Sequence, residues 1–225
     1  MPETNFDFPR AIIFDLDGTL LDTLEDLANS GNAVVAKRGL PTHSKEDYKV
    51  FIGDGMENLV QRIFPEGQRP ASEEELAAIL EEYKSEYEKH WNETTRAFDG
   101  IPELLDRAVE QGIKLGVLSN KAHEFTVKCV EEFLPDWKWD VIFGQRDGVP
   151  QKPAPDAAIE AAAVMDVSPD ECWFVGDSDV DVQTGVNAGM TTIGVTWGFR
   201  TAEELRANGA TRVVDRPDEI IPAQP

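Results

Sequence analysis

The sequence is poor in cysteine and in basic residues. Its 225 residues include 2 cysteines, and 21 lysines and arginines stand against 43 aspartates and glutamates, a formal net charge of −22. Because nucleic acids and anionic membrane surfaces are bound through basic residues, this balance argues against both as partners. Cys129 and Cys172 lie in apolar-patterned segments. Two cysteines are too few for a disulfide framework, so we expect two buried free thiols.

Long hydrophobic runs are also missing. No segment is long and apolar enough to span a membrane, and residues 1–8 have neither the basic nor the apolar region of a secretory signal. We therefore expect a cytoplasmic protein, either a monomer or a homodimer. A small anionic substrate stays compatible with the acidic balance, because local lysines and a metal ion can invert the potential at one site.

What the sequence does contain is a strand followed by two acids. Residues 11–14 form a continuous apolar run, which is typical of a strand buried on both faces. Asp15 and Asp17 follow at its carboxyl end, where ligands bind in open α/β sheets, and Gly18 breaks the extended conformation. Neighbouring carboxylates repel each other unless a cation lies between them. An acidic surface turn is the alternative, but the apolar pair at residues 20–21 disfavours it.

Residues 22–96 show helical periodicity and contain no convincing strand. Apolar residues recur at three- and four-residue spacing in four stretches, at about 24–38, 44–51, 57–64 and 72–91. Asp22 or Thr23 can cap the first of them. Between the second and third lies Gly53-Asp54-Gly55, and such a short turn is weak evidence of phosphate binding. We treat it as a candidate substrate loop.

From residue 97 onward, apolar strands alternate with amphipathic helices. Strands are expected near residues 114–118, 141–143, 172–175, 191–195 and 212–214. This alternation implies right-handed parallel crossovers, so we expect an α/β fold with an open, doubly wound, Rossmann-like parallel sheet. Residues 1–21 and 97–225 would form this core domain, and residues 22–96 an inserted all-helical cap domain.

Polar residues end three of the predicted strands. They are Asp15 and Asp17 on the first, Ser119 and Asn120 on the second, and Asp177, Ser178 and Asp181 on the strand at 172–175. The carboxyl ends of parallel strands share one edge of the sheet. Lys152 lies in a loop that leads away from the same edge, and the prolines at 153 and 155 stiffen this loop. Carboxylates suit Mg²⁺, while hydroxyl, ammonium and backbone N–H groups suit phosphate oxygens. A zinc site is disfavoured because the three histidines are not spaced as a pair.

Four motifs occur in order along the chain. They are D-L-D-G-T at 15–19, L-G-V-L-S-N at 115–120, Lys152 in Q-K-P, and G-D-S-D-V-D at 176–181. With this set the sequence resembles the phosphatases of the haloacid dehalogenase (HAD) superfamily. Within them it most resembles the phosphoglycolate phosphatases, through Ser119-Asn120-Lys121, the run at 151–156 and Thr196-Trp-Gly-Phe. The helical insertion is similar to the cap domain of that group.

The resemblance implies hydrolysis of a small phosphomonoester, such as 2-phosphoglycolate, through an aspartyl-phosphate. Asp15 would be the nucleophile, and Asp17 would act as general acid and then as general base. Mg²⁺ would be held by Asp15, the carbonyl of Asp17 and Asp177. Phosphate would be bound by Gly18, Thr19, Ser119, Asn120 and Lys152. Support would come from Ser178 and from Asp181, the latter holding Lys152 or metal-bound waters.

Two other functions stay open. A hexose-phosphate mutase has the same core but needs a second phosphate site in the cap. By ungapped comparison Gly55 stands where such mutases carry an arginine, and Thr19 where they often have valine. A phospho-accepting signalling or binding module shares the strand-end acids and the loop lysine, but such modules are about half this length and lack the helical insertion.

Other branches of the superfamily fit less well. A dehalogenase does not need the second acid, and Asp17 is present. A phosphonatase needs a cap lysine for a Schiff base, with Lys45 and Lys49 as candidates by proximity. Lys49 and Arg62 are the nearest cap residues that could bind a carboxylate of the substrate, although the favoured interpretation of both is a solvated surface charge.

Overall fold

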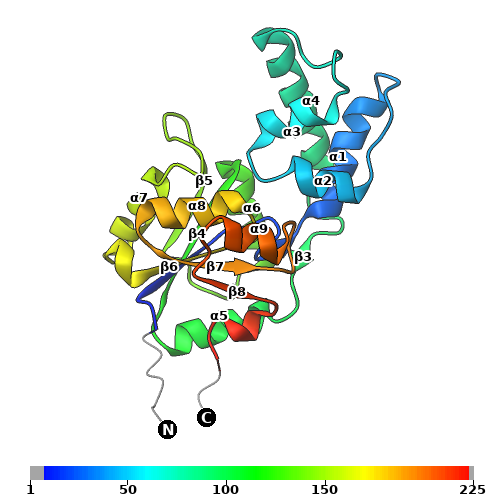
Figure 1. Ribbon diagram of the computed structural model, residues 1–225. Coiled ribbons are helices and arrows are strands. Elements are labelled where there is room, and N and C mark those ends of the chain that lie inside the picture. Colours follow the sequence, from blue (N-terminus) through cyan, green and yellow to red (C-terminus); the bar gives the residue numbers. More distant parts are fainter. Residues whose placement is uncertain (1–7, 223–225) are drawn as a thin grey trace.

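The computed structural model describes residues 8–222, and its centre is a six-stranded parallel sheet (Figure 1). The strands are β1 (Ala11–Phe14), β4 (Lys114–Ala122), β5 (Val141–Gln145), β6 (Cys172–Gly176), β7 (Thr191–Val195) and β8 (Arg212–Val214), in the spatial order β5-β4-β1-β6-β7-β8. All neighbouring pairs run parallel. The doubly wound α/β fold expected from the sequence is therefore confirmed, and β4, β1 and β6 lie side by side at its centre.

Strand β1 is central because both of its faces are apolar. All four of its residues are fully buried. Ile12 and Phe14 join one hydrophobic cluster with α5 (Ile101–Glu110) and α6 (His123–Phe133), whereas Ala11 and Ile13 join another with α7 (Asp156–Val164) and α8 (Asp179–Ala188). Successive side chains of a strand point to opposite faces, so helices cover the sheet on both sides. The helix α9 (Ala202–Ala207) and the 3₁₀ turns η1 (Pro169–Glu171) and η2 (Pro217–Glu219) complete this part.

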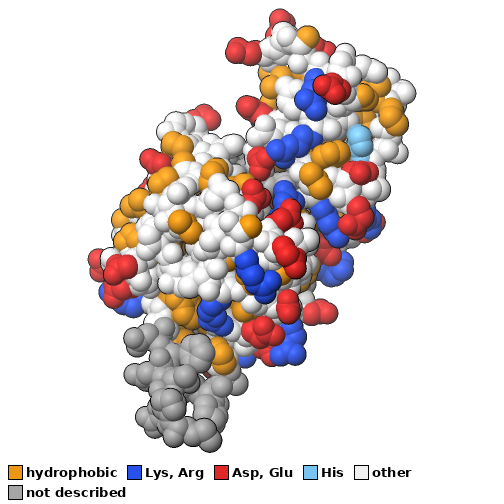
Figure 2. Space-filling model, viewed as in Figure 1, with side chains coloured by type: hydrophobic (Ala, Val, Ile, Leu, Met, Phe, Trp, Pro, Cys, Tyr) orange, Lys and Arg blue, Asp and Glu red, His pale blue; other side chains and the backbone are white. Residues whose placement is uncertain are grey.

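Four helices between β1 and β4 build a separate hydrophobic cluster. They are α1 (Leu24–Ala36), α2 (Lys45–Phe51), α3 (Met56–Ile63) and α4 (Glu73–His90), and they stand to one side of the sheet in Figure 1. Tyr48, Tyr83 and Tyr87 are the largest buried side chains of the cluster, and Phe125 of α6 reaches into it from the core. On the face seen in Figure 2, acidic and basic side chains are interspersed over these helices.

The two chain crossings between the helices and the sheet are joined to each other. β2 (Leu21–Asp22) pairs antiparallel with β3 (Arg96–Ala97), a short ribbon that the sequence pattern did not reveal. Close by, the buried carboxylate of Asp26 in α1 accepts hydrogen bonds from the N–H and hydroxyl groups of Thr94 and Thr95, at 2.6 to 3.1 Å. The start and end of the helical segment are thus fastened together at its base.

Other local expectations are met in part. Asp22 lies in β2, and Thr23 occupies the N-cap position of α1, but its side chain makes no capping hydrogen bond there. The expected side-chain cap of this helix is therefore not formed by either residue. Cys129 and Cys172 are free and buried, as predicted. No helix in residues 8–222 is long and apolar enough to cross a membrane.

Candidate active site

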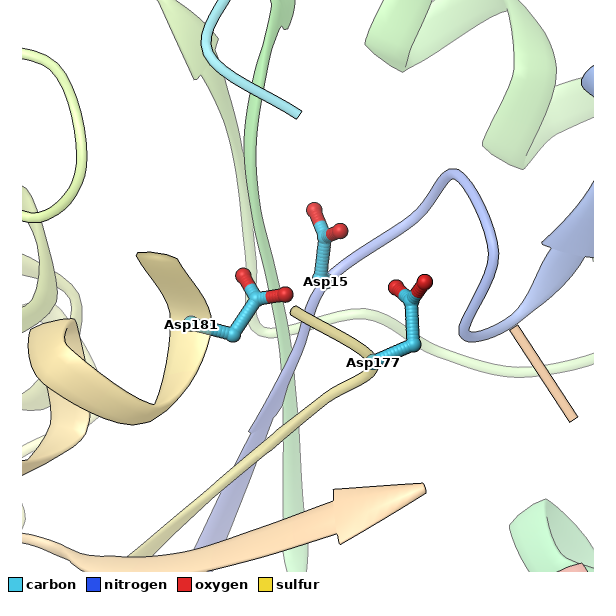
Figure 3. A group of neighbouring side chains, drawn as sticks. All are labelled: Asp15, Asp177 and Asp181. Carbon is cyan, nitrogen blue, oxygen red and sulfur yellow. The ribbon is translucent and has the colours of Figure 1, made fainter. Parts of the chain in front are cut away.

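The carboxyl ends of β1 and β6 bring three buried aspartates together. Asp15 follows β1, Asp177 follows β6, and Asp181 lies in the first turn of α8. One carboxylate oxygen of each lies within 4.8 Å of those of the other two, and Figure 3 shows the three side chains reaching toward a shared space. Because β1 and β6 are paired in the sheet, acids far apart in the sequence meet at one edge.

The amine of Lys152 lies within this acidic group. Its Nζ atom donates to Oδ1 of Asp15 at 2.8 Å and to Oδ1 of Asp181 at 2.6 Å. Burial lowers the pKa of Lys152, but the two carboxylates outweigh burial and hold that pKa above its ordinary value. Through its other oxygen, Asp181 accepts from the N–H and hydroxyl groups of Ser178, at 3.0 and 2.6 Å. Asp181 therefore connects the helix N-terminus to the buried lysine.

The site holds more negative charge than its amine offsets. Burial and the neighbouring Asp181 raise the pKa of Asp15 to about 7, against the opposing effect of Lys152. Burial, then Asp181 and Asp15, raises the pKa of Asp177 well above its ordinary value. One ammonium, that of Lys152, does not offset three buried carboxylates, so Asp15 and Asp177 are held toward their neutral forms. A hard divalent ion with oxygen ligands would relieve the repulsion, so the residues present fit Mg²⁺.

The carboxylate of Asp177 lies in a cradle built by small residues. It accepts from the hydroxyl of Thr19 at 3.0 Å and from the N–H of Phe199 at 2.7 Å. A Cβ atom at Gly18, whose φ is +87°, would lie 2.5 Å from an oxygen of Asp177, and one at Gly198 would lie 2.3 Å from its Cβ. Only glycine fits at these two positions. Gly198 was missed as a site residue, although it lies within the Thr-Trp-Gly-Phe run.

The structure shows other partners for the donors of Gly18 and Thr19, which the resemblance assigns to phosphate. The N–H of Gly18 donates to the carbonyl of Leu21 at 2.9 Å, and that of Thr19 donates to the carbonyl of Leu16 at 3.3 Å. Since the hydroxyl of Thr19 is also engaged with Asp177, the donors of both residues are used inside the turn. Gly18 and Thr19 therefore shape the turn and hold Asp177.

Asn120 fastens the loop that carries Lys152. Its side-chain oxygen accepts from the N–H of Lys152 at 2.9 Å, and its Nδ2 atom lies 3.1 Å from the carbonyls of both Lys152 and Gly53. The amide that was expected to bind phosphate is thus occupied in positioning the lysine. Ser119 precedes it, with a hydroxyl that accepts from the N–H of Lys121 at 3.2 Å.

The second acid of the opening motif has a lysine of its own. The carboxylate of Asp17 lies 3.0 and 3.2 Å from Nζ of Lys121 and accepts from the hydroxyl of Thr23 at 2.7 Å. Its side chain does not belong to the group of three acids found among the described residues. Lys121 was missed as a site residue. Its position directly after Ser119 and Asn120, at the carboxyl end of a strand, could have indicated it.

A cavity lies between the acids and the helical segment. From the core it is lined by Asp15, Asp17, Ser119, Asn120, Lys121 and Ala122, and from the helical segment by Leu27, Ile52, Gly53, Gly55, Met56, Leu59 and Tyr83. The helical wall is therefore apolar apart from backbone groups and the Tyr83 hydroxyl, which donates to the carbonyl of Leu27 at 3.3 Å. Among the described lining residues, Lys121 is the only cation.

The candidate substrate loop contributes to the cavity through its two glycines only. The side chain of Asp54 turns away and pairs with Arg62, whose guanidinium also donates to the carbonyl of Phe51 at 3.0 Å. Lys49 pairs with Glu46 at 2.9 Å. Neither Lys49 nor Arg62 lines the cavity.

Comparison with known proteins agrees with this geometry. Residues 12–195 match the family of haloacid dehalogenase-like hydrolases. The chain is similar to the phosphoglycolate phosphatase of Aquifex aeolicus, with 27% identity over 94% of this chain and 95% of the relative. It is also similar to the N-acetylmuramic acid 6-phosphate phosphatase of Pseudomonas aeruginosa, with 29% identity over 94% and 93%.

A solved structure shows the same architecture. The crystal structure of a predicted phosphoglycolate phosphatase from Haemophilus somnus 129pt superimposes with a TM-score of 0.87 at 26% identity, over 96% of this chain and 97% of that one. The family match covers strands β1 to β7, the strand-end acids and the helical insertion together, while β8 lies beyond it. The chain therefore belongs to the haloacid dehalogenase-like hydrolases, as its ordered motifs indicate.

Proposed function

We propose that the chain hydrolyses a small phosphomonoester through an aspartyl-phosphate formed on Asp15. The observation that carries this proposal is the buried group of Asp15, Asp177 and Asp181 around the amine of Lys152. Asp15, Asp177 and the carbonyl of Asp17 would hold Mg²⁺, which when bound offsets the repulsion between a carboxylate nucleophile and an anionic phosphate. Both carboxylate oxygens of Asp181 accept hydrogen bonds, one from Lys152 and the other from Ser178, so Asp181 acts on the site by holding Lys152 in place.

Asp15 and Asp17 both act in each of the two steps of the reaction. A carboxylate oxygen of Asp15 attacks phosphorus in line, the bond from phosphorus to the leaving oxygen breaks, and Asp17 gives that oxygen a proton. A water molecule then attacks the same phosphorus and gives its proton to Asp17, and the bond to Asp15 breaks. Lys152 and Ser119 stabilise the transferring phosphoryl group, while Asn120 keeps Lys152 in place.

We assign residues 22–96 the role of a cap domain over this site. Their helices supply one wall of the cavity, and two core residues reach across to them. Asn120 donates to the carbonyl of Gly53, and the guanidinium of Arg200 donates to the carbonyls of Lys49 and Ile52. A cap in this position excludes bulk water from the aspartyl-phosphate.

We propose 2-phosphoglycolate or a similar small organic phosphate as the substrate, supported by the likeness to phosphoglycolate phosphatases, while the lining of the cavity argues against a hexose. A hexose presents several hydroxyl groups, and a site that buries them without partners loses binding free energy. The cap wall offers Leu27, Ile52, Met56 and Leu59 instead. A hexose-phosphate mutase would also need a second phosphate site, and no described cap residue that lines the cavity is a cation.

Release of phosphate from a panel of phosphomonoesters, with the metal varied, tests the proposal. We expect Mg²⁺-dependent release from p-nitrophenyl phosphate and the highest kcat/KM on 2-phosphoglycolate. If sugar phosphates rank equally with 2-phosphoglycolate, the proposed substrate is wrong, but the proposed phosphatase activity stands. Binding of phosphate analogues without any turnover would instead favour a phospho-accepting module.

A further inference from the structure

Each of the two acids of the opening motif pairs with its own buried lysine. Lys152 holds Asp15, the proposed nucleophile, while Lys121 holds Asp17, the proposed acid and base. We propose that Lys121 is a positioning residue for Asp17, and that Tyr87 of the cap makes this positioning depend on the cap. The inference rests on the proposed function, because it concerns the proton that Asp17 transfers.

The ammonium group of Lys121 pairs with one carboxylate, that of Asp17. Its Nζ atom lies 3.0 and 3.2 Å from the two oxygens of Asp17, and the side chains of Lys121 and Asp17 are 5% and 12% exposed. On its other side, Nζ lies 4.6 Å from the centre of the Tyr87 ring in α4. A cation over an aromatic face is attracted to it, and more strongly where water is excluded. The ammonium is thus held between a core carboxylate and a cap ring.

Stability alone does not account for such a pair. A buried ion pair gains little over apolar residues of the same volume, because both charges must leave water. Lys121 and Asp17 both line the cavity, where two apolar side chains would continue the wall formed by Leu27 and Leu59. A pair retained at this place is therefore expected to act on the reaction.

The expected action is orientation. Asp17 must present its proton to the leaving oxygen and later accept one from water, and general acid–base help of this kind contributes about 10²–10⁴-fold. A misplaced catalytic group loses much of that factor. Lys121 and Thr23 restrain the carboxylate from two directions, and Thr23 itself stands at the first turn of the cap.

The test is a leaving-group series on Lys121→Met, which keeps the length of the side chain and removes its charge. The ethoxide of ethyl phosphate is a poor leaving group and depends on protonation, whereas the p-nitrophenolate of p-nitrophenyl phosphate leaves as the anion. We expect kcat/KM on ethyl phosphate to fall by about 10²-fold and that on p-nitrophenyl phosphate by less than about 10-fold. Asp17 also serves the second step, so p-nitrophenol should appear as a burst followed by slow turnover.

Two further variants keep the test decisive. Lys121→Arg retains a cation and should recover most of the loss on ethyl phosphate, and Tyr87→Leu should shift the series in the same direction as Lys121→Met but by less. Lys128→Met is the matched control, because Lys128 also lies over an aromatic ring, that of Phe125, and also pairs with α4, through Glu88, yet is exposed. It should leave the series unchanged.

Equal losses on all leaving groups in the first turnover, or no loss in any variant, would overturn the inference. A loss confined to 2-phosphoglycolate and absent with ethyl phosphate would also overturn it, because Lys121 would then bind the substrate's carboxylate. If the wild type itself shows no phosphatase activity, the proposed function fails instead.

Discussion

Oδ1 of Asp15 lies 2.8 Å from Nζ of Lys152, with both side chains buried at the end of the central strand. The proposed nucleophile is therefore oriented before any substrate arrives. The same amine reaches Asp181 at 2.6 Å, so its single positive charge is shared by two carboxylates.

Lys152→Met removes that charge and leaves the acids without their amine. Loss of a donor to the transferring phosphoryl group should lower kcat by about 10²–10³-fold. Breaking a buried pair from one side should also cost about 3–5 kcal/mol of the free energy of unfolding, measured by chemical denaturation. Combining it with Asp181→Asn should restore part of the stability and none of the activity. If the double variant is no more stable than the single one, charge repulsion is not the cause of the loss.

A divalent cation should stabilise the folded chain. Asp15 and Asp177 are held toward their neutral forms by burial and by their acidic neighbours, so an ion that binds between them favours the native state by mass action. We expect Mg²⁺ to raise Tm in the absence of any substrate and a chelator to abolish both this rise and the turnover. In Asp177→Asn the rise should be much smaller. An equal rise in both proteins would place the ion elsewhere.

The base of the cap should make stability depend on pH. Burial raises the pKa of Asp26, but hydrogen bonds from Thr94 and Thr95 outweigh burial and hold that pKa below its ordinary value. A folded pKa below the unfolded value of about 3.9 means stabilisation that is fully present above that pH and is lost as the pH falls through the folded pKa.

Asp26→Asn should therefore cost about 1–3 kcal/mol of the free energy of unfolding at pH 7, because an amide nitrogen would face the N–H donors. The difference from the wild type should shrink as the pH falls below about 4. Asp22→Asn is the control, since the partner of Asp22, Arg96, has a side chain 70% exposed and such pairs contribute about 0–1 kcal/mol. A difference that stays constant with pH would contradict the assignment.

Sequence reasoning reached the parts of the fold that local patterns determine. The apolar run at 11–14 predicted a strand buried on both faces, and the strand-end acids Asp15 and Asp177 were expected at one edge of the sheet. The roles of Lys121 and Gly198 could not be predicted, because they depend on tertiary contacts. Lys121 reads as a strand-end lysine until Asp17 and Tyr87 are placed beside it, and Gly198 reads as a turn glycine until Asp177 lies 2.3 Å from its missing Cβ.

Three predicted site residues have partners that the sequence pattern did not reveal. Thr19 and Asn120 carry donors suited to phosphate, but the fold engages those donors with Asp177 and with the backbone of Lys152. The cap loop was expected to offer Asp54, whose carboxylate instead pairs with Arg62 one helix away. In each case the residue type indicated a donor or an acceptor, whereas the partner could be identified only from the packed structure.

The central claim is that Asp15 becomes phosphorylated during turnover. Its most direct test is acid quenching of the enzyme during steady-state hydrolysis, followed by mass spectrometry of the peptide that contains Asp15. With p-nitrophenyl phosphate, whose leaving group needs no proton, we expect the added mass of one phosphoryl group on Asp15 in the wild type, more of it in Asp17→Asn, whose second step is slowed, and none in Asp15→Asn. Turnover with the phosphoryl group on another residue, or with no phosphorylated protein in either the wild type or Asp17→Asn, would contradict this claim.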